Sequence, residues 1–250
     1  MIHTSLFWKN HFEQNLTHKR IDWDISPSIT QQEKDQILYS LKAWQLGETS
    51  DGAHLLSAVK LYAQKINDQD YIEAVKLFIK EEQKHGHNLG VYIDRIGEKR
   101  SRKDLGDTLF RKIRYFNKSM ELWTITVIIV ESAAQVFYQA LSDATNCLLL
   151  KSICRDILID EAHHIKFQNE RLYQIFQRKR FYNKAFSIGW YGLLFFGTIH
   201  AVWIGHNKAF KAGGVSKKEF MRMMYYKFFH TLKFSHAKFP AIEKLKLADA

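Results

Sequence analysis

Two short stretches of the chain combine a glutamate with a histidine three residues later, Glu82 with His85 and Glu161 with His164. On an α-helix, residues i and i+3 lie on one face with their Cβ atoms about 5–6 Å apart. A carboxylate and an imidazole in this arrangement can bind the same metal ion. A single Glu-x-x-His pattern arises by chance in many helices, but two facing copies with two further carboxylates can hold a pair of ions. The pattern predicts a dinuclear metal site.

The two further carboxylates are Glu48 and Glu131. Glu131 is the only charged residue between positions 122 and 142, and Glu48 occupies the apolar stripe of a predicted helix. A buried carboxylate is costly unless it is protonated, paired or bound to a metal ion. Metal binding therefore explains both positions. The alternative for Glu48 is the edge of the stripe, where its side chain reaches solvent.

Two neighbours of these motifs are excluded from the expected ligand set. Glu81 precedes Glu82 but points about 100° away around the helix, so Glu82 is the expected ligand. His163 likewise faces away from His164, and we expect it at the surface or against a ligand. The predicted metal ligands are Glu48, Glu82, His85, Glu131, Glu161 and His164.

Four helices must position these residues, and hydrophobic periodicity predicts them over residues 30–66, 69–96, 119–142 and 148–177. Thr30 and Glu33 form a capping-box pattern at the start of the first helix. Residues 97–118 are too many for a hairpin and predict a crossover between the second and third helices. The expected fold class is all-α, a four-helix bundle with a long crossover and a C-terminal helical extension.

The spacing of the ligands tests this arrangement. Glu131 and Glu161 lie 15 residues before and after residue 146, the expected turn. Antiparallel helices would hold both at one height, about 22 Å from the turn. Around a turn at residue 67, Glu48 and Glu82 are offset by about one helical turn. The 34-residue separation of Glu48 and Glu82 is the irregular part of the pattern.

This ligand set resembles that of the ferritin-like di-iron superfamily, which includes rubrerythrins, bacterioferritins, acyl-carrier-protein desaturases, aldehyde-deformylating oxygenases and ribonucleotide reductase radical subunits. The resemblance covers residues 30–177 and not the extension. It implies a ferritin-like bundle in which Glu131 or Glu82 bridges two metals and each histidine binds one. Leu89 stands where the radical subunits have a tyrosine, and the Cys-x-x-Cys iron module of rubrerythrin is absent from the sequence.

The charge distribution divides the chain. Residues 178–250 account for the entire net charge of +11, because residues 1–177 have equal numbers of basic and acidic residues. We expect an N-terminal lead-in at 1–29 that packs outside the bundle with one short helix, the bundle at 30–177, and the basic extension at 178–250. A basic extension on a neutral body is typical of attraction to an anionic surface or of solubility.

The extension contains two distinctive segments. Residues 185–207 include no Asp, Glu, Lys or Arg, which permits a helix buried against the bundle or a dimer partner, a one-sided membrane contact, or a membrane span. We expect His200 and His206 to be packed or hydrogen-bonded rather than metal-bound. Residues 216–235 predict a basic amphipathic helix, suited to a membrane surface, to partner docking, or to packing with a solvated face.

The cysteines indicate the compartment. Cys147 and Cys154 are about 10.5 Å apart along a shared helix, too far for a disulfide. This is typical of a reducing cytosol. We therefore expect a cytoplasmic protein, membrane-associated if residues 185–235 contact lipid.

The ligand set indicates the chemistry. Carboxylates and imidazoles suit iron and manganese, so the expected cofactor is two iron ions, or manganese, or a mixed Fe/Mn pair. The sequence favours an O₂-dependent di-iron oxidoreductase of the oxygenase, hydroxylase or desaturase type. Its expected partners are O₂, an apolar or acyl-type substrate, an external electron donor, an anionic membrane or an acidic carrier protein, and a second copy of the chain, without nucleic acid. The alternatives are an iron-handling protein, for storage, ferroxidation or peroxide detoxification, and a di-manganese catalase-like protein.

Overall fold

A computed structural model of the protein describes residues 2–102 and 119–237. Eight α-helices and no strands are present in these described ranges. The all-α fold prediction is confirmed. The helices are α1 (Ser5–Asn15), α2 (Gln31–Glu48), α3 (Ala53–Ile66), α4 (Gln69–Arg95), α6 (Met120–Asp143), α7 (Leu148–Gln177), α8 (Phe181–Ala212) and α9 (Lys217–His236).

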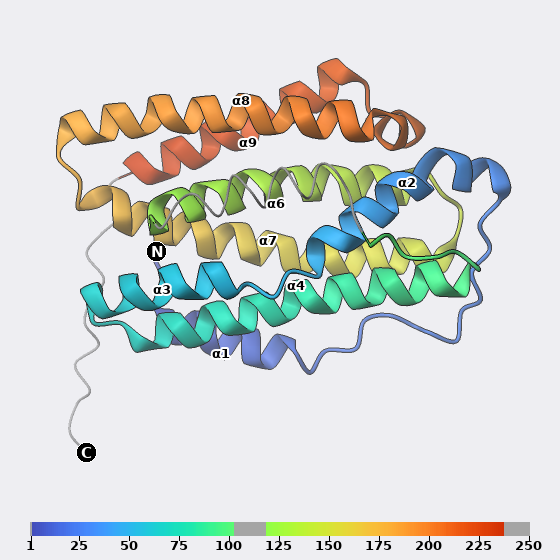
Figure 1. The fold of residues 1–250 in the computed structure, drawn as a ribbon, viewed down its shortest axis with the longest axis horizontal. Helices are drawn as coiled ribbons and strands as arrows, with labels where there is room; N and C mark the ends of the chain where they lie inside the picture. The colour runs from blue at the N-terminus through green and yellow to red at the C-terminus, as the bar shows by residue number, and fades with distance from the viewer. Residues whose placement is uncertain (1, 103–118, 238–250) are drawn as a thin grey trace.

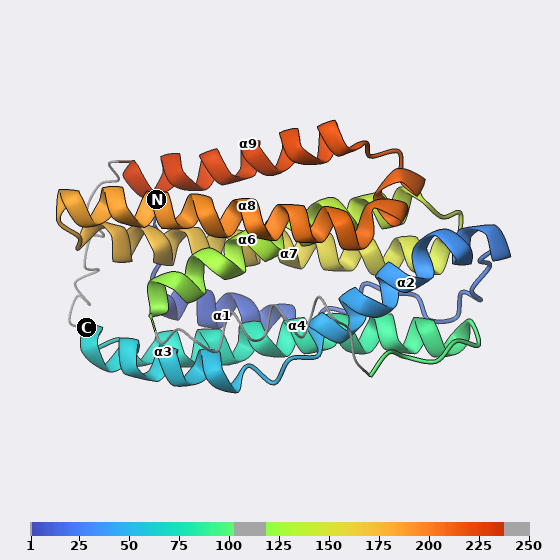
Figure 2. The same ribbon diagram turned by 45° about the horizontal axis from the view of Figure 1, so that its top comes forward.

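The four-helix bundle consists of α4, α6, α7 and the pair α2–α3, which run along one another in Figure 1. α1 packs against α4 on one side of the bundle. α8 and α9 form an outer layer that covers α6 and α7 on the other side (Figure 2). Most of the predicted crossover, residues 103–118, lies outside the described residues.

The first bundle helix begins as predicted and ends earlier. Thr30 accepts a hydrogen bond from the Glu33 amide, while the Glu33 carboxylate accepts one from the Thr30 amide, which completes the capping box. The prediction of a single helix over residues 30–66 is wrong. The chain leaves the helix after Glu48 and begins α3 at Ala53, with Gly52 in the left-handed region at a φ of 65°. This φ favours glycine, and it explains why the helix is interrupted here.

The interruption brings the end of α2 close to α4. A Cβ atom added to Gly86 of α4 would lie 2.8 Å from the Thr49 side chain and 3.2 Å from the backbone of Glu48. The glycine therefore lets the two backbones approach. The interruption also explains the irregular 34-residue separation of Glu48 and Glu82, because the intervening segment is not one continuous helix.

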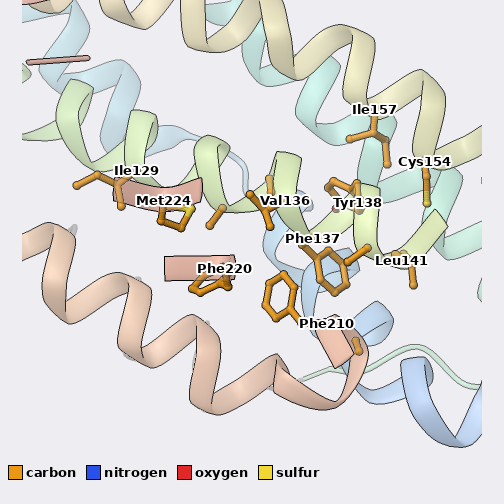
Figure 3. Close-up of a cluster of buried hydrophobic side chains, with 14 of the residues drawn as sticks. Ile129, Val136, Phe137, Tyr138, Leu141, Cys154, Ile157, Phe210, Phe220 and Met224 are labelled. Carbon is orange, nitrogen blue, oxygen red and sulfur yellow. The ribbon is translucent and has the colours of Figure 1, made fainter. Parts of the chain in front are cut away.

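Two apolar clusters stabilise this arrangement. One is centred on α6 and α7 and extends to α8 and α9, where Phe137 contacts Phe210 and Phe210 contacts Phe220 (Figure 3). The other joins α1, α3 and α4 to the ends of α6 and α7. Full burial of each large apolar side chain contributes roughly 1.5–3 kcal/mol. Both cysteines are free and buried.

Replacing Gly86 by alanine should destabilise the protein by about 1–3 kcal/mol, because the added methyl group must push α2 away from α4. Gly205 of α8 is a matched control, since a Cβ atom added to it would have no neighbour within 4 Å. Gly205→Ala should stabilise the helix by roughly 0.5–1 kcal/mol. Urea denaturation followed by circular dichroism measures both free energies of unfolding. Equal changes in the two variants would contradict the close approach at Gly86.

Candidate metal centre

The structure brings all six predicted ligands together in the middle of the bundle. They form two overlapping groups of four, and the donor atoms within each group lie within 4.8 Å of one another. One group is Glu48, Glu82, His85 and Glu161. The other is Glu82, Glu131, Glu161 and His164.

The overlap indicates how two ions would share the site. Glu82 and Glu161 belong to both groups, so each is placed to bridge two ions, whereas Glu131 belongs to one group. Of the two bridging candidates that the resemblance implied, the geometry therefore favours Glu82 over Glu131. Glu82 is also the most accessible of the four carboxylates, with a side chain 18% exposed, while the other three are buried.

Several donor atoms in the site have no hydrogen-bond partner among the described residues. These include Nδ1 of His85, Nδ1 of His164 and both carboxylate oxygens of Glu161, all of which are buried. Nδ1 of His164 lies 2.8 Å from Oε1 of Glu82, but both atoms remain without a hydrogen bond. Unpaired buried polar atoms are costly. Their convergence fits a site built for metal ions.

The electrostatics of the protein without metal agree with this fit. Burial and the charge of Glu82 raise the pKa of Glu48 well above its ordinary value. Burial and the charge of Glu131 do the same to the pKa of Glu161. Burial alone would lower the pKa of His164, but the surrounding carboxylates raise it well above its ordinary value. The cluster thus binds positive charge, as protons or as metal ions.

Each histidine is oriented by a carboxylate of the other helix, which accepts a hydrogen bond from the ring nitrogen that faces away from the site. Nε2 of His85 donates to Asp160 at 3.1 Å, and Nε2 of His164 donates to Glu81 at 2.8 Å. Protonation of Nε2 leaves the Nδ1 lone pair free to face a metal ion. Each supporting carboxylate immediately precedes a Glu ligand in the chain. A carboxylate of α4 therefore orients the histidine of α7, and a carboxylate of α7 orients the histidine of α4.

Glu81 belongs to neither group of donor atoms, but it is fully buried and orients His164. His163 is partly exposed, and its Nδ1 donates to the backbone oxygen of Ile159 at 3.0 Å. The role of Asp160 was not predicted from the sequence. The signal was available, because Asp160 precedes Glu161 as Glu81 precedes Glu82.

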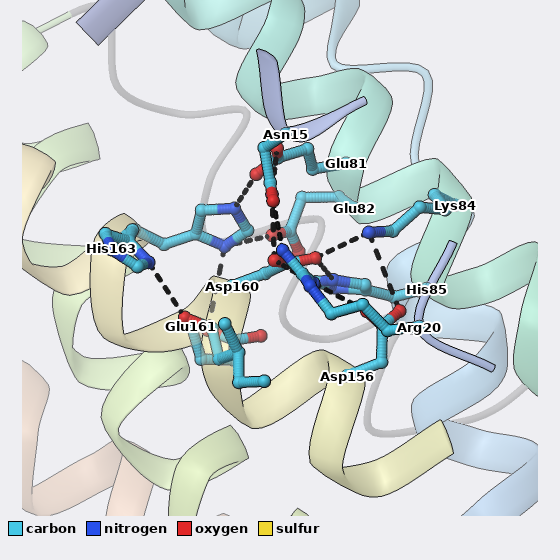
Figure 4. A network of polar contacts seen from close by, with 12 residues as sticks. Asn15, Arg20, Glu81, Glu82, Lys84, His85, Asp156, Asp160, Glu161 and His163 are labelled. Atoms are coloured by element: carbon cyan, nitrogen blue, oxygen red, sulfur yellow. Dashed lines mark hydrogen bonds and ion pairs between the residues drawn. The ribbon is translucent and has the colours of Figure 1, made fainter. Parts of the chain in front are cut away.

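The N-terminal segment, whose short helix α1 lies on the outside of the bundle against α4, also contacts the site. The Asn15 amide donates to Glu81 at 2.6 Å and to Asp160 at 2.8 Å, and so joins the two supporting carboxylates (Figure 4). Arg20 donates to Asp160 at 2.7 Å, and Lys84 donates to it at 2.6 Å. Although burial opposes it, hydrogen bonds from His85, Lys84 and Asn15 lower the pKa of Asp160.

One further side chain contacts a ligand directly. The Tyr138 hydroxyl donates to Oε1 of Glu48 at 2.6 Å. Burial and the nearby charge of Glu48 raise the pKa of this phenol well above its ordinary value, so it remains protonated. Trp44 lies beside it, with ring centroids 5.9 Å apart, and stacks on Phe137 at 4.7 Å. An aromatic wall therefore closes the Glu48 side of the site.

Comparisons with known proteins identify the fold. No protein-family model matches the chain, and a search of curated proteins finds no match. Solved structures do match: two R2-like ligand-binding oxidase variants with reconstituted Mn/Fe cofactors have TM-scores of 0.66 at 14% and 15% identity, each covering 93% of both chains. A third has a TM-score of 0.63 at 16% identity. The fold is ferritin-like.

The similarity in fold to these structures extends beyond residue 177. Coverage of 93% of the chain leaves too few unmatched residues to omit the C-terminal extension. At these identities the comparison establishes the fold. The donor set and its unpaired atoms supply the argument for a ferritin-like metal site in this chain.

Replacing Asn15 by alanine should lower metal affinity about 10–100-fold, because the two carboxylates that orient the histidines lose their shared donor. Gln14→Ala changes the exposed neighbour in α1 and should leave affinity unchanged. Competition with a chromophoric chelator measures both constants. Equal affinity in the two variants would show that Asn15 does not support the site.

The metal-free protein should lose stability as the pH rises above about 6.5, the ordinary pKa of histidine, which also lies above the ordinary value of 4.5 for glutamate. Glu48, Glu161 and His164 all have raised pKa values in the folded state, so folding takes up protons that must leave as the pH rises. Glu48→Gln should flatten this dependence. Thermal unfolding of chelator-treated protein at several pH values tests it, and a wild-type melting temperature that rises over this range would contradict the assignment.

Proposed function

We propose that this protein is an O₂-dependent di-metal oxidase. The observation that supports this most directly is the convergence of four carboxylates and two buried imidazoles, among which Nδ1 of His85 and both carboxylate oxygens of Glu161 have no hydrogen-bond partner among the described residues. The fold, shared with structures described as R2-like ligand-binding oxidases, is consistent with the proposal.

The donor set suits iron and manganese, so the proposed cofactor is two iron ions or a mixed Fe/Mn pair. Glu48 and His85 would hold one ion, Glu131 and His164 the other, and Glu82 and Glu161 would contact both. When bound, such a pair supplies the electrons that reduce O₂.

The chain orients the metal ligands, excludes bulk water and supplies a hydrogen-bond donor. Asp160 and Glu81 hold the two imidazoles with Nδ1 toward the site. Burial of Glu48, Glu131 and Glu161 excludes bulk water. The Tyr138 hydroxyl holds a proton at Oε1 of Glu48. These contacts let the site change charge without opening to solvent.

We further propose an apolar or amphipathic substrate of acyl type and an external electron donor. Apolar rings adjoin the site. The ring of Phe78 lies edge-on to that of His164, with 4.7 Å between the centroids, and the Phe12 ring centroid lies 6.0 Å from the same imidazole. On the other side, Trp44 lies beside Tyr138. Such walls favour an apolar group over a charged one. Repeated O₂ reduction also requires electrons from outside the chain.

Replacing His164 by alanine, or Glu131 by alanine, should reduce bound metal from two ions per chain to one. His163→Ala is the matched control, because this neighbouring imidazole faces a backbone carbonyl rather than the site. Elemental analysis after anaerobic loading gives the stoichiometry. Two ions per chain in the His164 variant would remove it from the ligand set.

The oxidase proposal is tested by loading the protein anaerobically with Fe(II), adding O₂, and recording oxygen uptake and absorption with and without a long-chain fatty acid. Uptake that increases with the fatty acid, with an altered acid recovered, supports the proposal. A shell-sized particle that accumulates iron mineral would instead indicate iron storage. Preferential manganese loading with peroxide disproportionation would indicate a catalase-like protein.

A further inference from the structure

α8 has two unlike faces. One face packs against α6 and α2 and buries large rings and chains at regular spacing, including Tyr191, Phe195, Ile199 and Trp203. The opposite face is open to solvent although it is also apolar. Its exposed members are 45–78% accessible: Phe186, Trp190, Leu193, Phe196 and Ile204.

The open face has no charge to solvate it. Residues 185–207 contain no Asp, Glu, Lys or Arg, which corresponds to about 34 Å of helix. A helix facing water normally shows charged residues on its outer side. An apolar surface of this length, on which His200 is the exposed polar side chain between Phe196 and Ile204, indicates an interaction site.

Basic residues surround this face. Arg178 and Arg180 lie exposed before its N-terminal end, and Lys208 and Lys211 lie exposed at the other end.

α9 lies beside α8 in the same outer layer (Figure 2) and adds exposed basic and aromatic side chains. The exposed side chains of α9 include Lys217, Lys218, Arg222, Tyr226 and Phe229. Residues 178–237 contain 11 basic residues and one acidic residue, Glu219.

The exposed apolar face of α8 and the basic residues around it favour one kind of binding partner over the others. A second copy of the chain would place basic ends against basic ends in either a parallel or an antiparallel pair. α8 is long and apolar enough to cross a membrane, but a span would strip its inner face from α6. An anionic bilayer accepts the apolar face and pairs its headgroups with the surrounding basic residues.

We propose that the outer layer of α8 and α9 binds the surface of an anionic phospholipid bilayer on one side, with α8 parallel to it. Phe186, Leu193 and Ile204 enter the acyl boundary. Trp190 lies at the interface, where its amphipathic ring is favoured. The inference goes beyond the proposed oxidase chemistry and does not depend on it, because the face is formed without the metal ligands.

Flotation of the full-length, metal-loaded protein with two kinds of vesicle tests the proposal. Vesicles of phosphatidylcholine with about 30% phosphatidylglycerol, whose surface potential is negative, should carry the protein upward. Pure phosphatidylcholine vesicles should bind at least about tenfold less, and raised salt should weaken binding to the anionic ones. Trp190→Phe should remove a blue shift in the tryptophan emission that accompanies binding.

The decisive variant is Leu193→Glu combined with Ile204→Glu, which should reduce binding at least about tenfold, because two charges enter the apolar boundary. Leu61→Glu is a matched control, since Leu61 of α3 and Leu193 are each 62% exposed. The control should bind like the wild type. Circular dichroism and metal stoichiometry must be unchanged in both, which separates lost docking from a damaged fold or metal site.

Four results would overturn the proposal. The first is no binding of the folded wild type to anionic vesicles. The second is equal binding by the double variant and the Leu61 control. The third is a wild-type dimer in light scattering that the double variant converts to a monomer without vesicle binding, which would assign the face to self-association. Saturable binding of an acidic carrier protein in place of vesicles would likewise assign it to a protein partner.

Discussion

The structure depends on the cost of placing four carboxylates in one dry space. Glu48, Glu82, Glu131 and Glu161 lie close enough to repel one another, and water cannot screen them well. The protein reduces this cost only by binding positive charge between them. The surrounding helices therefore enclose a cation-binding site, and the apolar clusters on either side fix the positions of these helices.

Around this cluster the chain repeats one device twice. On α4 and on α7, an acidic residue, a Glu ligand and a histidine follow one another at the same spacing, and each acidic residue holds the histidine of the other helix. Asn15 joins the two supports from outside the bundle. The short helix α1 therefore contacts the supports of both histidines, and a substitution of Asn15 affects the orientation of both.

The parts of the structure that follow from local periodicity could be predicted from the sequence. The helices over residues 69–96, 119–142 and 148–177, and the convergence of six ligands, follow from i, i+3 spacing and from charges in apolar stripes. The interruption after Glu48 could not be predicted, because a glycine such as Gly52 permits a left-handed backbone but also occurs within continuous helices. Asn15 and Tyr138 were missed because their contacts join distant segments that no spacing rule relates.

The position of Glu48 at the end of α2 has a mechanical consequence. The other five ligands lie within α4, α6 and α7, where hydrogen bonds of the helix restrain the backbone on both sides. Glu48 is restrained on one side only, and its carboxylate is tied to Tyr138. Of the six ligands, it is therefore the one whose backbone is least restrained by helical hydrogen bonds, and the hydrogen bond from Tyr138 holds its side chain in place. One ligand of the centre lies at a helix end, and the other five lie within helices.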